Sequence, residues 1–490
     1  MEAHRYLKTR LATVDGEVMQ QRHDDEPVEV TLTTLDYEPD QAWFQQKVRP
    51  FNLFDDKLYR LEVISTPSYT YLFTDIHHIV FDGLSASLFM GDVLKACQGE
   101  ALQPEKYEAY DFALYEQELK DSDAMTEAEQ HFDGLVSEAE TLSYPDSANP
   151  DGVTSALVTT TIPADVINAF CAANGVTAGS FMQAAFAETM SRLTREENGL
   201  YLTVNNGRGS GVELMACVGM FVKTLPVVRP NVKRGELTVD YVKAMHEQLH
   251  LSYAEDFYPY TRIVERHGIR AEMMFVYQGG LFEGGNIDGV EQIPVALDTS
   301  KFPITVTAYP ENNHYAVSIE YDGRRYGKKD MTILAQAIAN MSLSMATEKV
   351  LADAETVSDE EKKQIIALST GKHLDVDIEK TFAQAFEERA ALYPDSLAVA
   401  DKDSELTYQE LSHYSDVLAH RLIDEGVKSD EFVCVMLDRM KEFPMAVLAI
   451  HKVGAAYTPL DFEYPNDRLN YMIKKLRSEE RRAGKECRSR

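Results

Sequence analysis

Seven consecutive residues, from His77 to Gly83, combine groups that could move a proton and position a substrate. They read His-His-Ile-Val-Phe-Asp-Gly. Histidine has an ordinary pKa of about 6.5, so it can act as a general acid or base near neutral pH. Neighbouring side chains on an extended strand point to opposite faces, so we expect only one of His77 and His78 to face a cavity. Asp82 can form a charge pair that orients the loop, and Gly83 permits a close backbone approach.

A strand and a helix are predicted on either side of these residues. Ser68–His78 is rich in aromatic and β-branched side chains, which favours an extended strand. Apolar residues then recur at helical spacing over Leu84–Cys97, which predicts an amphipathic helix. The two histidines would therefore stand where a strand gives way to a helix.

A second group of elements is predicted further along the chain. Ala164–Thr194 contains an apolar helical stripe, and Leu200–Val204 is typical of a strand. The turn-rich segment Asn205–Ser210 follows, and we expect it to be a loop that binds no ligand. Strand-like and helical segments alternate without a fixed repeat, which indicates an α/β or α+β fold.

The composition narrows the possible classes of protein. A chain of 490 residues predicts about two to four folding units. Its 80 acidic and 48 basic residues give a net charge of −32, which disfavours binding to nucleic acid or to an anionic membrane. The five cysteines are irregularly spaced, which indicates a cytoplasmic protein rather than a disulfide framework or a metal site. No apolar run approaches the roughly 20 residues of a membrane-spanning helix.

The His77–Gly83 segment resembles the active-site motif of condensation domains of nonribosomal peptide synthetases: two histidines, three variable residues, aspartate and glycine. Segments similar to the family's later motifs follow in the same order, at Tyr110–Tyr115, Val218–Pro226, Asp256–Tyr260 and Asp298–Pro303. Lys223 replaces the usual asparagine, and Lys301 and Phe302 replace the commoner arginine–asparagine pair. This shared order makes a chance resemblance improbable.

The resemblance implies a condensation domain over residues 1–355, with two chloramphenicol-acetyltransferase-like lobes arranged in a V and the active site in a tunnel between them. The first lobe would span residues 1–160 and be truncated at its start, and the second would span residues 161–355. The implied catalytic residues are His78, His77, Asp82 and Gly83, and the implied substrate-channel residues are Ser300, Tyr110 and Gly219.

The family's opening motifs have no match in this sequence, and one of them supplies an arginine partner for the motif aspartate. The sequence therefore identifies no cation for Asp82 and leaves open whether it has one. A buried carboxylate without a partner would destabilise the fold by about 3–5 kcal/mol.

A second resemblance follows a polar linker at residues 356–379, where Ser358–Glu361 is typical of a helix capping box. Leu406–Leu411 and His451–Asp461 resemble the first two core motifs of adenylation domains, so residues 380–476 are identified as the start of that domain's N-terminal subdomain. The phosphate loop of that family has no match, so ATP and magnesium are expected only in a complete adenylation domain. Residues 477–490 resemble translated sequencing-adapter sequence and are expected to be non-native.

By resemblance, the amine of one carrier-bound aminoacyl group attacks a carrier-bound acyl thioester and forms an amide. His78 would accept the ammonium proton or orient the amine, and His77 and Asp82 would support it structurally. The substrates would arrive on the phosphopantetheine arms of donor and acceptor carrier domains, with the rest of the synthetase in cis; no cofactor or metal is expected to bind directly. The alternatives are an epimerisation domain, a non-catalytic copy that docks carrier domains, and an inert truncated fragment.

Overall fold

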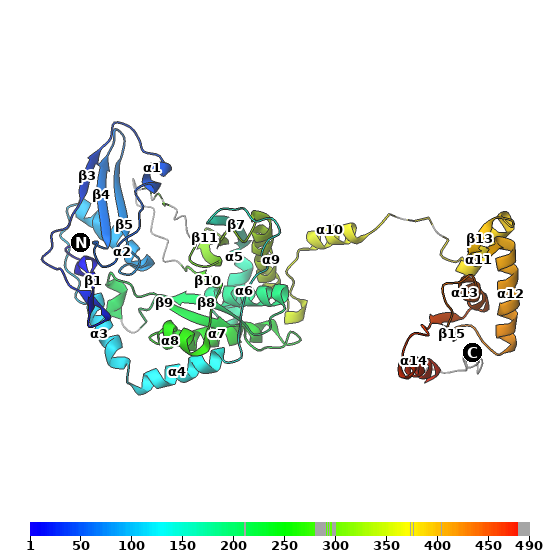
Figure 1. The fold of residues 1–490 in the computed structure, drawn as a ribbon. Coiled ribbons are helices and arrows are strands. Elements are labelled where there is room, and N and C mark those ends of the chain that lie inside the picture. Colours follow the sequence, from blue (N-terminus) through cyan, green and yellow to red (C-terminus); the bar gives the residue numbers. More distant parts are fainter. Residues whose placement is uncertain are drawn as a thin grey trace. The chain divides into compact units, whose positions relative to one another are not determined.

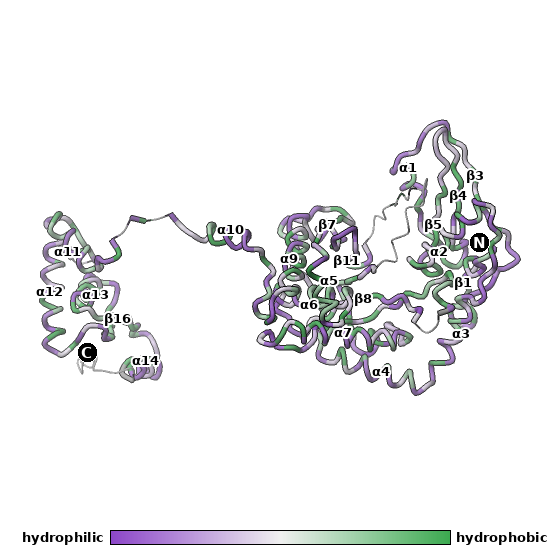
Figure 2. The backbone as a smooth tube through the Cα atoms, turned by 180° about the vertical axis from the view of Figure 1, so that it is seen from behind, coloured by the Kyte–Doolittle hydropathy of each residue, from purple (hydrophilic) through white to green (hydrophobic). Residues whose placement is uncertain are grey.

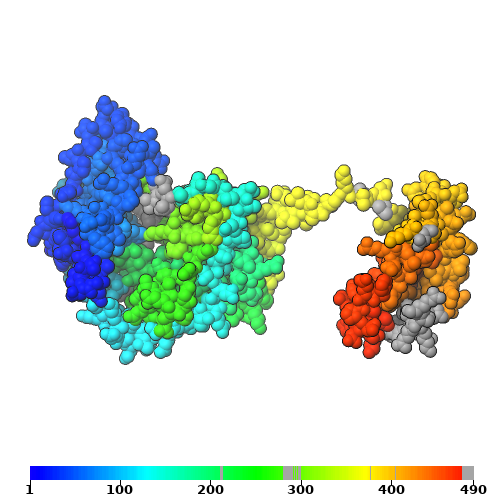
Figure 3. Space-filling model, viewed as in Figure 1, coloured from blue at the N-terminus to red at the C-terminus, as the bar shows by residue number. Residues whose placement is uncertain are grey.

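The computed structural model describes residues 1–209, 212–279, 291, 293, 295, 300–372, 374, 375, 377–402 and 404–478. The chain forms two compact units that divide after Ser369 (Figure 1). The first unit consists of a small lobe, blue in Figure 3, and a larger lobe that follows it in sequence. Among the described residues, no helix combines the length and the apolar character that crossing a membrane requires.

The small lobe is built on a three-stranded sheet in the order β3-β4-β5. Strands β4 and β5 are antiparallel, and β3 runs parallel to β4. The strands of this lobe are β1 (Arg10–Val14), β2 (Glu17–Gln21), β3 (Thr31–Thr34), β4 (Tyr59–Ser65) and β5 (Thr70–Ile76). Its helices are η1 (Arg5–Lys8), α1 (Gln41–Gln45), α2 (Gly83–Cys97) and α3 (Ala109–Leu119). The turn from β5 to α2 carries the two histidines.

The large lobe contains a seven-stranded mixed sheet in the order β6-β8-β10-β11-β12-β7, with β9 also paired to β8. Its strands are β6 (Glu140–Thr141), β7 (Ala156–Pro163), β8 (Gly199–Asn205), β9 (Lys223–Val228), β10 (Met273–Tyr277), β11 (Ile304–Glu311) and β12 (His314–Tyr321). Its helices are α4 (Asp123–Val136), α5 (Ala164–Asn174), α6 (Ala178–Thr194), η2 (Val212–Ala216), α7 (Thr238–Ala254), α8 (Tyr260–His267), α9 (Lys328–Thr347) and η3 (Leu351–Asp353).

Helix α6 lies at the centre of the large lobe. It contacts α5, α7, α9 and the strands β8 and β10. Phe186 is fully buried, and its ring centroid lies 4.9 Å from that of Tyr201 and 5.0 Å from that of Phe275. The hydrophobic stretches of this lobe are green in Figure 2. This core anchors one side of the functional site through β8 and the loop that follows it.

Most of the predicted elements are present, with two differences. The strand predicted over Ser68–His78 ends at Ile76, because the chain turns at the histidines. The helical region Ala164–Thr194 forms two helices rather than one. Gly175 ends α5 in the left-handed region at φ 67°, and the Thr177 hydroxyl then accepts the Ser180 N–H to begin α6. Both residues are ordinary helix-end signals.

The linker begins with a helix, α10 (Asp359–Ser369), which lies within the first unit. The predicted capping box is confirmed, since Glu361 N–H donates to the Ser358 hydroxyl and Ser358 N–H donates to the Glu361 carboxylate. Asn340 of α9 also donates to the Glu361 carboxylate at 2.9 Å and to the Thr356 carbonyl at 3.1 Å. The start of α10 is therefore tied to α9.

The second unit contains two small sheets and four helices in its described part. Strands β13 (Leu397–Ala400) and β14 (Glu405–Thr407) are antiparallel, and β15 (Phe432–Val435) and β16 (Ala456–Pro459) are parallel. The helices are α11 (Phe382–Leu392), α12 (Tyr408–Asp424), α13 (Glu442–Val453) and α14 (Asn466–Ser478). Residues 479–490, which form most of the tail expected to be non-native, lie outside the described residues.

Replacing Phe186 with alanine is expected to destabilise the first unit by about 3–5 kcal/mol, because it removes a fully buried ring and leaves a cavity. Leu193→Ala is the matched control, since Leu193 lies on the same helix but is 40% exposed and should cost less than about 0.5 kcal/mol. Urea unfolding of the two variants measures the difference. Equal losses would contradict the central place of α6 in the core.

Candidate functional site

His77 holds the turn between β5 and α2 in shape. Its backbone N–H donates to the Leu58 carbonyl at 2.9 Å, and its Nδ1 accepts the Ile79 N–H at 3.0 Å. An Nδ1 atom that accepts a hydrogen bond carries no proton, so the ring is neutral and holds its proton on Nε2. The half-buried ring also meets the Phe51 ring edge to face, with centroids 5.6 Å apart. These contacts make His77 a structural part of the turn.

His78 differs from its neighbour in both exposure and hydrogen bonding. The residue is exposed, and its Nδ1 lies 2.7 Å from the Phe81 carbonyl oxygen. Because a carbonyl only accepts, Nδ1–H is the donor, and among the described residues no hydrogen bond involves Nε2. The two rings thus lie in different surroundings, while the expectation that one of them faces a cavity stays a prediction. The cause is turn geometry rather than strand alternation, since β5 has already ended at Ile76.

The pKa of His77 is lowered from its usual value. Partial burial is the main cause, and the neighbouring His78 and the Lys301 cation lower it further, while Asp75 raises it. A neutral ring is what the hydrogen bond from Ile79 requires. The electrostatic environment and the hydrogen bonding of His77 therefore favour the same protonation state.

Asp82 is buried and accepts four hydrogen bonds. Its carboxylate accepts the Ser85 N–H at 2.9 Å, which caps α2, and the Phe221 N–H at 3.0 Å. Arg208 donates to both oxygens, from Nη1 at 2.8 Å and from Nη2 at 3.1 Å. Burial alone would raise the pKa of Asp82, but these hydrogen bonds, mainly from the Arg208 guanidinium, hold it below its usual value.

Asp82 does have a cation, because Arg208 is its partner. Arg208 lies in the turn-rich segment Asn205–Ser210, for which the sequence predicts only a loop. Its side chain is fully buried, as is that of Asp82. Besides Asp82, the guanidinium donates to the Ser85 hydroxyl and to the carbonyls of Leu214 and Cys217. The only available sequence signal was one arginine among glycines, 126 residues from its partner.

Gly219, in the segment that follows Arg208, contacts the start of α2. The Gly219 carbonyl accepts the Asp82 N–H at 3.2 Å and the Ser85 hydroxyl at 2.8 Å. A Cβ at Gly219 would lie 2.7 Å from the Ala109 Cβ and 2.8 Å from a ring carbon of Phe221, so the close approach requires glycine. Gly219 is buried in this contact, and its place in a substrate channel stays a prediction.

The other predicted site residues, Gly83, Tyr110 and Ser300, form no hydrogen bond with the Asp82–Arg208 pair among the described residues. Gly83 is the first residue of α2. The Tyr110 hydroxyl lies 2.5 Å from the Thr9 hydroxyl, and the Arg22 guanidinium lies 4.8 Å from the centre of the Tyr110 ring. The Ser300 hydroxyl donates to the Phe302 carbonyl. Within the described residues, no hydrogen bond or ring contact joins Tyr110 or Ser300 to His78, so their role in a channel stays a prediction. Asp298 and Thr299 lie outside the described residues.

A pocket of about 570 Å³ brings three of the motif-like segments together. Ala113, Lys223 and Asp256–Tyr260 all line it. Lys223, at the position of the usual asparagine, forms an ion pair with Glu116. Burial raises the pKa of Asp256, which accepts a hydrogen bond from Asn205 at 2.7 Å. The volume falls within the roughly 300–1,000 Å³ of pockets that hold small ligands.

Replacing either member of the buried Asp82–Arg208 pair is expected to lower the stability of the first unit. Asp82→Asn and Arg208→Met should each lower the free energy of unfolding by about 3–5 kcal/mol, because each leaves a buried charge without its partner. The double variant should lose less than the sum of the two, since it leaves neither charge behind. Urea unfolding of the parent chain, the two single variants and the double variant measures these losses as a double-mutant cycle. Additive losses would show that the two side chains are not coupled.

The stability of the first unit is expected to fall as the pH drops below about 6.5. His77 has a lowered pKa in the folded state, so between that pKa and 6.5 the unfolded chain binds more protons, and the stability is fully present only above 6.5. Asparagine can accept the same N–H two residues on, so His77→Asn should keep the turn and reduce the pH dependence. Thermal midpoints from pH 5 to 8 measure this. An unchanged pH profile in His77→Asn would refute the assignment.

Two family models match the chain. The model described as a condensation domain matches residues 1–366, and the model described as an AMP-binding enzyme matches residues 386–479. The chain is 26% identical to tyrocidine synthase 3 of Brevibacillus parabrevis over 96% of this chain and 8% of that protein. It is also 26% identical to bacitracin synthase 2 of Bacillus licheniformis over 96% of this chain and 19% of that protein. The chain thus spans less than a fifth of the length of these relatives.

Solved structures show the same fold at low sequence identity. The four-domain nonribosomal peptide synthetase holo-AB3403, bound to AMP and glycine, matches with a TM-score of 0.67 and 20% identity, over 97% of this chain and 39% of that chain. The epimerization domain from the third module of tyrocidine synthetase B matches with a TM-score of 0.59 and 17% identity, over 70% of this chain and 86% of that chain. The first condensation domain of the CDA synthetase matches with a TM-score of 0.56 and 16% identity, over 73% and 88%.

These likenesses confirm the predicted mixed α/β fold of two lobes followed by part of an AMP-binding domain. The fold alone does not separate condensation from epimerization, since both kinds of domain share it. The condensation-domain model, however, matches well over half of the 490 residues, and the AMP-binding match follows it along the chain. The chain therefore belongs to the condensation-domain family of nonribosomal peptide synthetases.

Proposed function

We propose that the first unit forms an amide bond between a carrier-bound acyl thioester and a carrier-bound amine. The observation that carries this proposal is the state of His78, an exposed imidazole whose Nδ1–H is engaged by the Phe81 carbonyl. The free lone pair on Nε2 can accept a proton or a hydrogen bond from an incoming amine. The family match supplies the class of reaction, and the arrangement of His78 supplies the group that could assist it.

In the proposed reaction, the amine nitrogen attacks the thioester carbonyl. An α-amino group titrates near 8. The lone pair on Nε2 of His78 can accept the proton that this nitrogen loses as the new bond forms. The N–C bond forms and the C–S bond breaks, and the proton passes from nitrogen to Nε2 of His78 and then to the departing thiolate. Such general base catalysis contributes typically about 10²–10⁴ to the rate.

The other motif residues act by position. The Asp82–Arg208 pair fixes the start of α2, and His77 fixes the turn before it, so the two together orient His78 without touching a substrate. Carrier domains bearing phosphopantetheine are the proposed partners, as donor and as acceptor. The phosphate loop of adenylation domains has no match in this sequence, so we derive no ATP-dependent step from the second unit.

An epimerisation domain is the second candidate, because a base with a free Nε2 could also remove a proton from a substrate's α-carbon. The likeness to the epimerization domain of tyrocidine synthetase B supports it. The AMP-binding segment after the first unit and the Val218–Pro226 motif favour condensation. Analysing the chirality of a loaded donor after incubation, with and without an acceptor, separates the two reactions.

His78→Ala is expected to lower the rate of amide formation by about 10²–10⁴, because the variant loses the proposed base. The thermal midpoint should stay close to that of the parent chain, because His78 is exposed. The assay mixes the 490-residue chain with two loaded carrier domains and measures the amide product by mass spectrometry. His250→Ala, at an exposed histidine of α7, is the matched control.

Two outcomes would count against this proposal. Full amide formation by His78→Ala would remove His78 from the mechanism. No amide product from the unaltered chain would instead support a non-catalytic docking copy or an inert fragment, and carrier binding by the same chain would then identify the former.

A further inference from the structure

A cluster of arginines surrounds the buried carboxylate of Glu188 on α6. Glu188 is fully buried and accepts from Nε of Arg192 at 2.8 Å, of Arg229 at 2.8 Å and of Arg234 at 2.9 Å. Burial alone would raise the pKa of Glu188, but the arginines hold it below its usual value. Three guanidinium groups therefore share one carboxylate, and the cluster has more positive than negative charge.

All three arginines form further hydrogen bonds, and those of Arg192 and Arg234 bear on the pocket described below. Arg192 donates through its two terminal nitrogens to the carbonyls of Leu351 and Ala354, at 2.5 Å each, in the segment that leads into the linker. Arg234 donates to the Ser191 hydroxyl at 2.8 Å and to Glu197 at 3.3 Å. Each terminal nitrogen of a guanidinium carries two N–H groups, so both residues keep donors beyond those used here.

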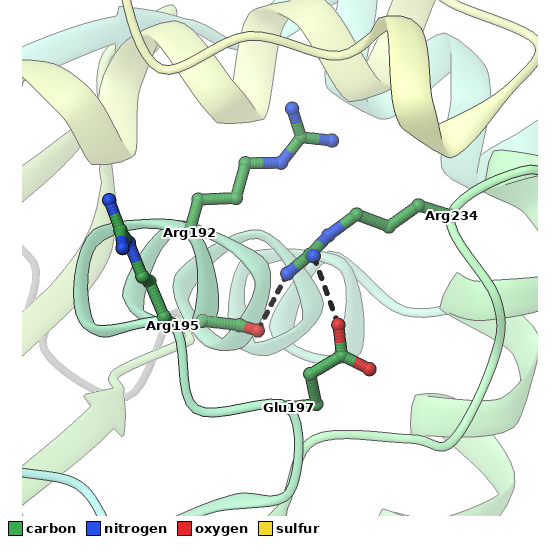
Figure 4. A pocket seen from close by; sticks show the side chains of 5 residues that line it. Arg192, Arg195, Glu197 and Arg234 are labelled. Carbon is green, nitrogen blue, oxygen red and sulfur yellow. Dashed lines mark hydrogen bonds and ion pairs between the residues drawn. The ribbon is translucent and has the colours of Figure 1, made fainter. Parts of the chain in front are cut away.

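The end of α6 borders a pocket of about 250 Å³, which is lined by Ser191, Arg192, Arg195, Glu197 and Arg234 (Figure 4). This volume lies below the roughly 300–1,000 Å³ of pockets that take drug-sized ligands, so the pocket suits a small ion or group. Three of its lining residues are cationic and one is anionic. The anionic one, Glu197, has a side chain that is 73% exposed and is therefore well screened by water.

Arg195 is the unusual member of the lining. It ends α6 in the left-handed region at φ 66°, where a side chain causes strain that glycine avoids. Helices α5, α8 and α13 end in the same conformation, and all three use glycine there. Arg195 is exposed, and among the described residues no hydrogen bond or ion pair involves its guanidinium. Arg195 thus stands at a position that favours glycine, and its guanidinium has no partner among the described residues.

We propose that this pocket is a binding site for a small oxyanion of the phosphate class. Guanidinium groups bind phosphate oxygens through paired, charge-assisted hydrogen bonds, and Arg195 with the spare donors of Arg192 and Arg234 offers such a set. A cationic pocket also stands out on a chain whose net charge is −32. The site lies at the end of α6 and does not depend on the function proposed for His78.

The oxyanion could be a free ion or the phosphate group of an ester, and three probes separate these sources. Isothermal titration of the 490-residue chain uses inorganic phosphate, inorganic pyrophosphate and AMP, with the ionic strength held constant by sodium chloride. We expect saturable binding of at least one probe. Binding of the inorganic ions indicates a free ion, and binding of AMP alone indicates a phosphate ester. In both cases Arg195→Gln should weaken the binding by about tenfold or more.

Matched variants distinguish a ligand contact from a structural role. Arg270→Gln removes the same charge at an exposed arginine outside the pocket and should leave the affinity unchanged. Arg195→Gly should weaken binding like Arg195→Gln while its thermal midpoint stays equal to or above that of the parent chain, because glycine relieves the strain at this position. No saturable binding by any probe, or equal affinity in the parent chain and Arg195→Gln, would overturn the proposal.

Discussion

The buried ion pair between Asp82 and Arg208 is the interaction on which the rest of the site depends. Asp82 caps α2 and also accepts the Phe221 N–H, two residues after Gly219. Arg208 donates to the carbonyls of Leu214 and Cys217 in the same segment. A desolvated carboxylate and a desolvated guanidinium stay buried only when their hydrogen bonds are met, and here each has several partners. The pair therefore joins the small lobe's histidine-bearing turn to a loop of the large lobe.

The local structure around the candidate site could largely be predicted from the sequence. Several features depend only on residues that are close together in the sequence, so the sequence alone can predict them. They are the His77–Gly83 motif, the helix that follows it, and the helix caps at Thr177 and Ser358. The motif order also led to the family before any fold was known. The strand that ends two residues early shows the limit of such reading, since turn geometry at His77 is set by the distant Leu58 carbonyl.

Arg208 could not be found in this way. Its identity as a partner depends on a contact between two lobes, and neither composition nor periodicity encodes which lone arginine reaches a given carboxylate. The arginines around Glu188 could not be predicted either, because two of them lie far from it in the sequence. One arginine comes from α6 and the other two from later positions in the large lobe. Long-range electrostatic partners are the part of this fold that sequence patterns leave open.

The distance along the chain between Asp82 and Arg208 has a consequence for biosynthesis. The two residues are 126 positions apart, and ribosomes add about 5–20 residues per second, so roughly 6–25 s pass between their synthesis. During that interval the nascent small lobe contains an aspartate whose counter-ion has not yet been made. The turn that carries His77 and His78 can reach its final form only after translation has delivered β8 and the loop beyond it, so the candidate site is completed late in the synthesis of this chain.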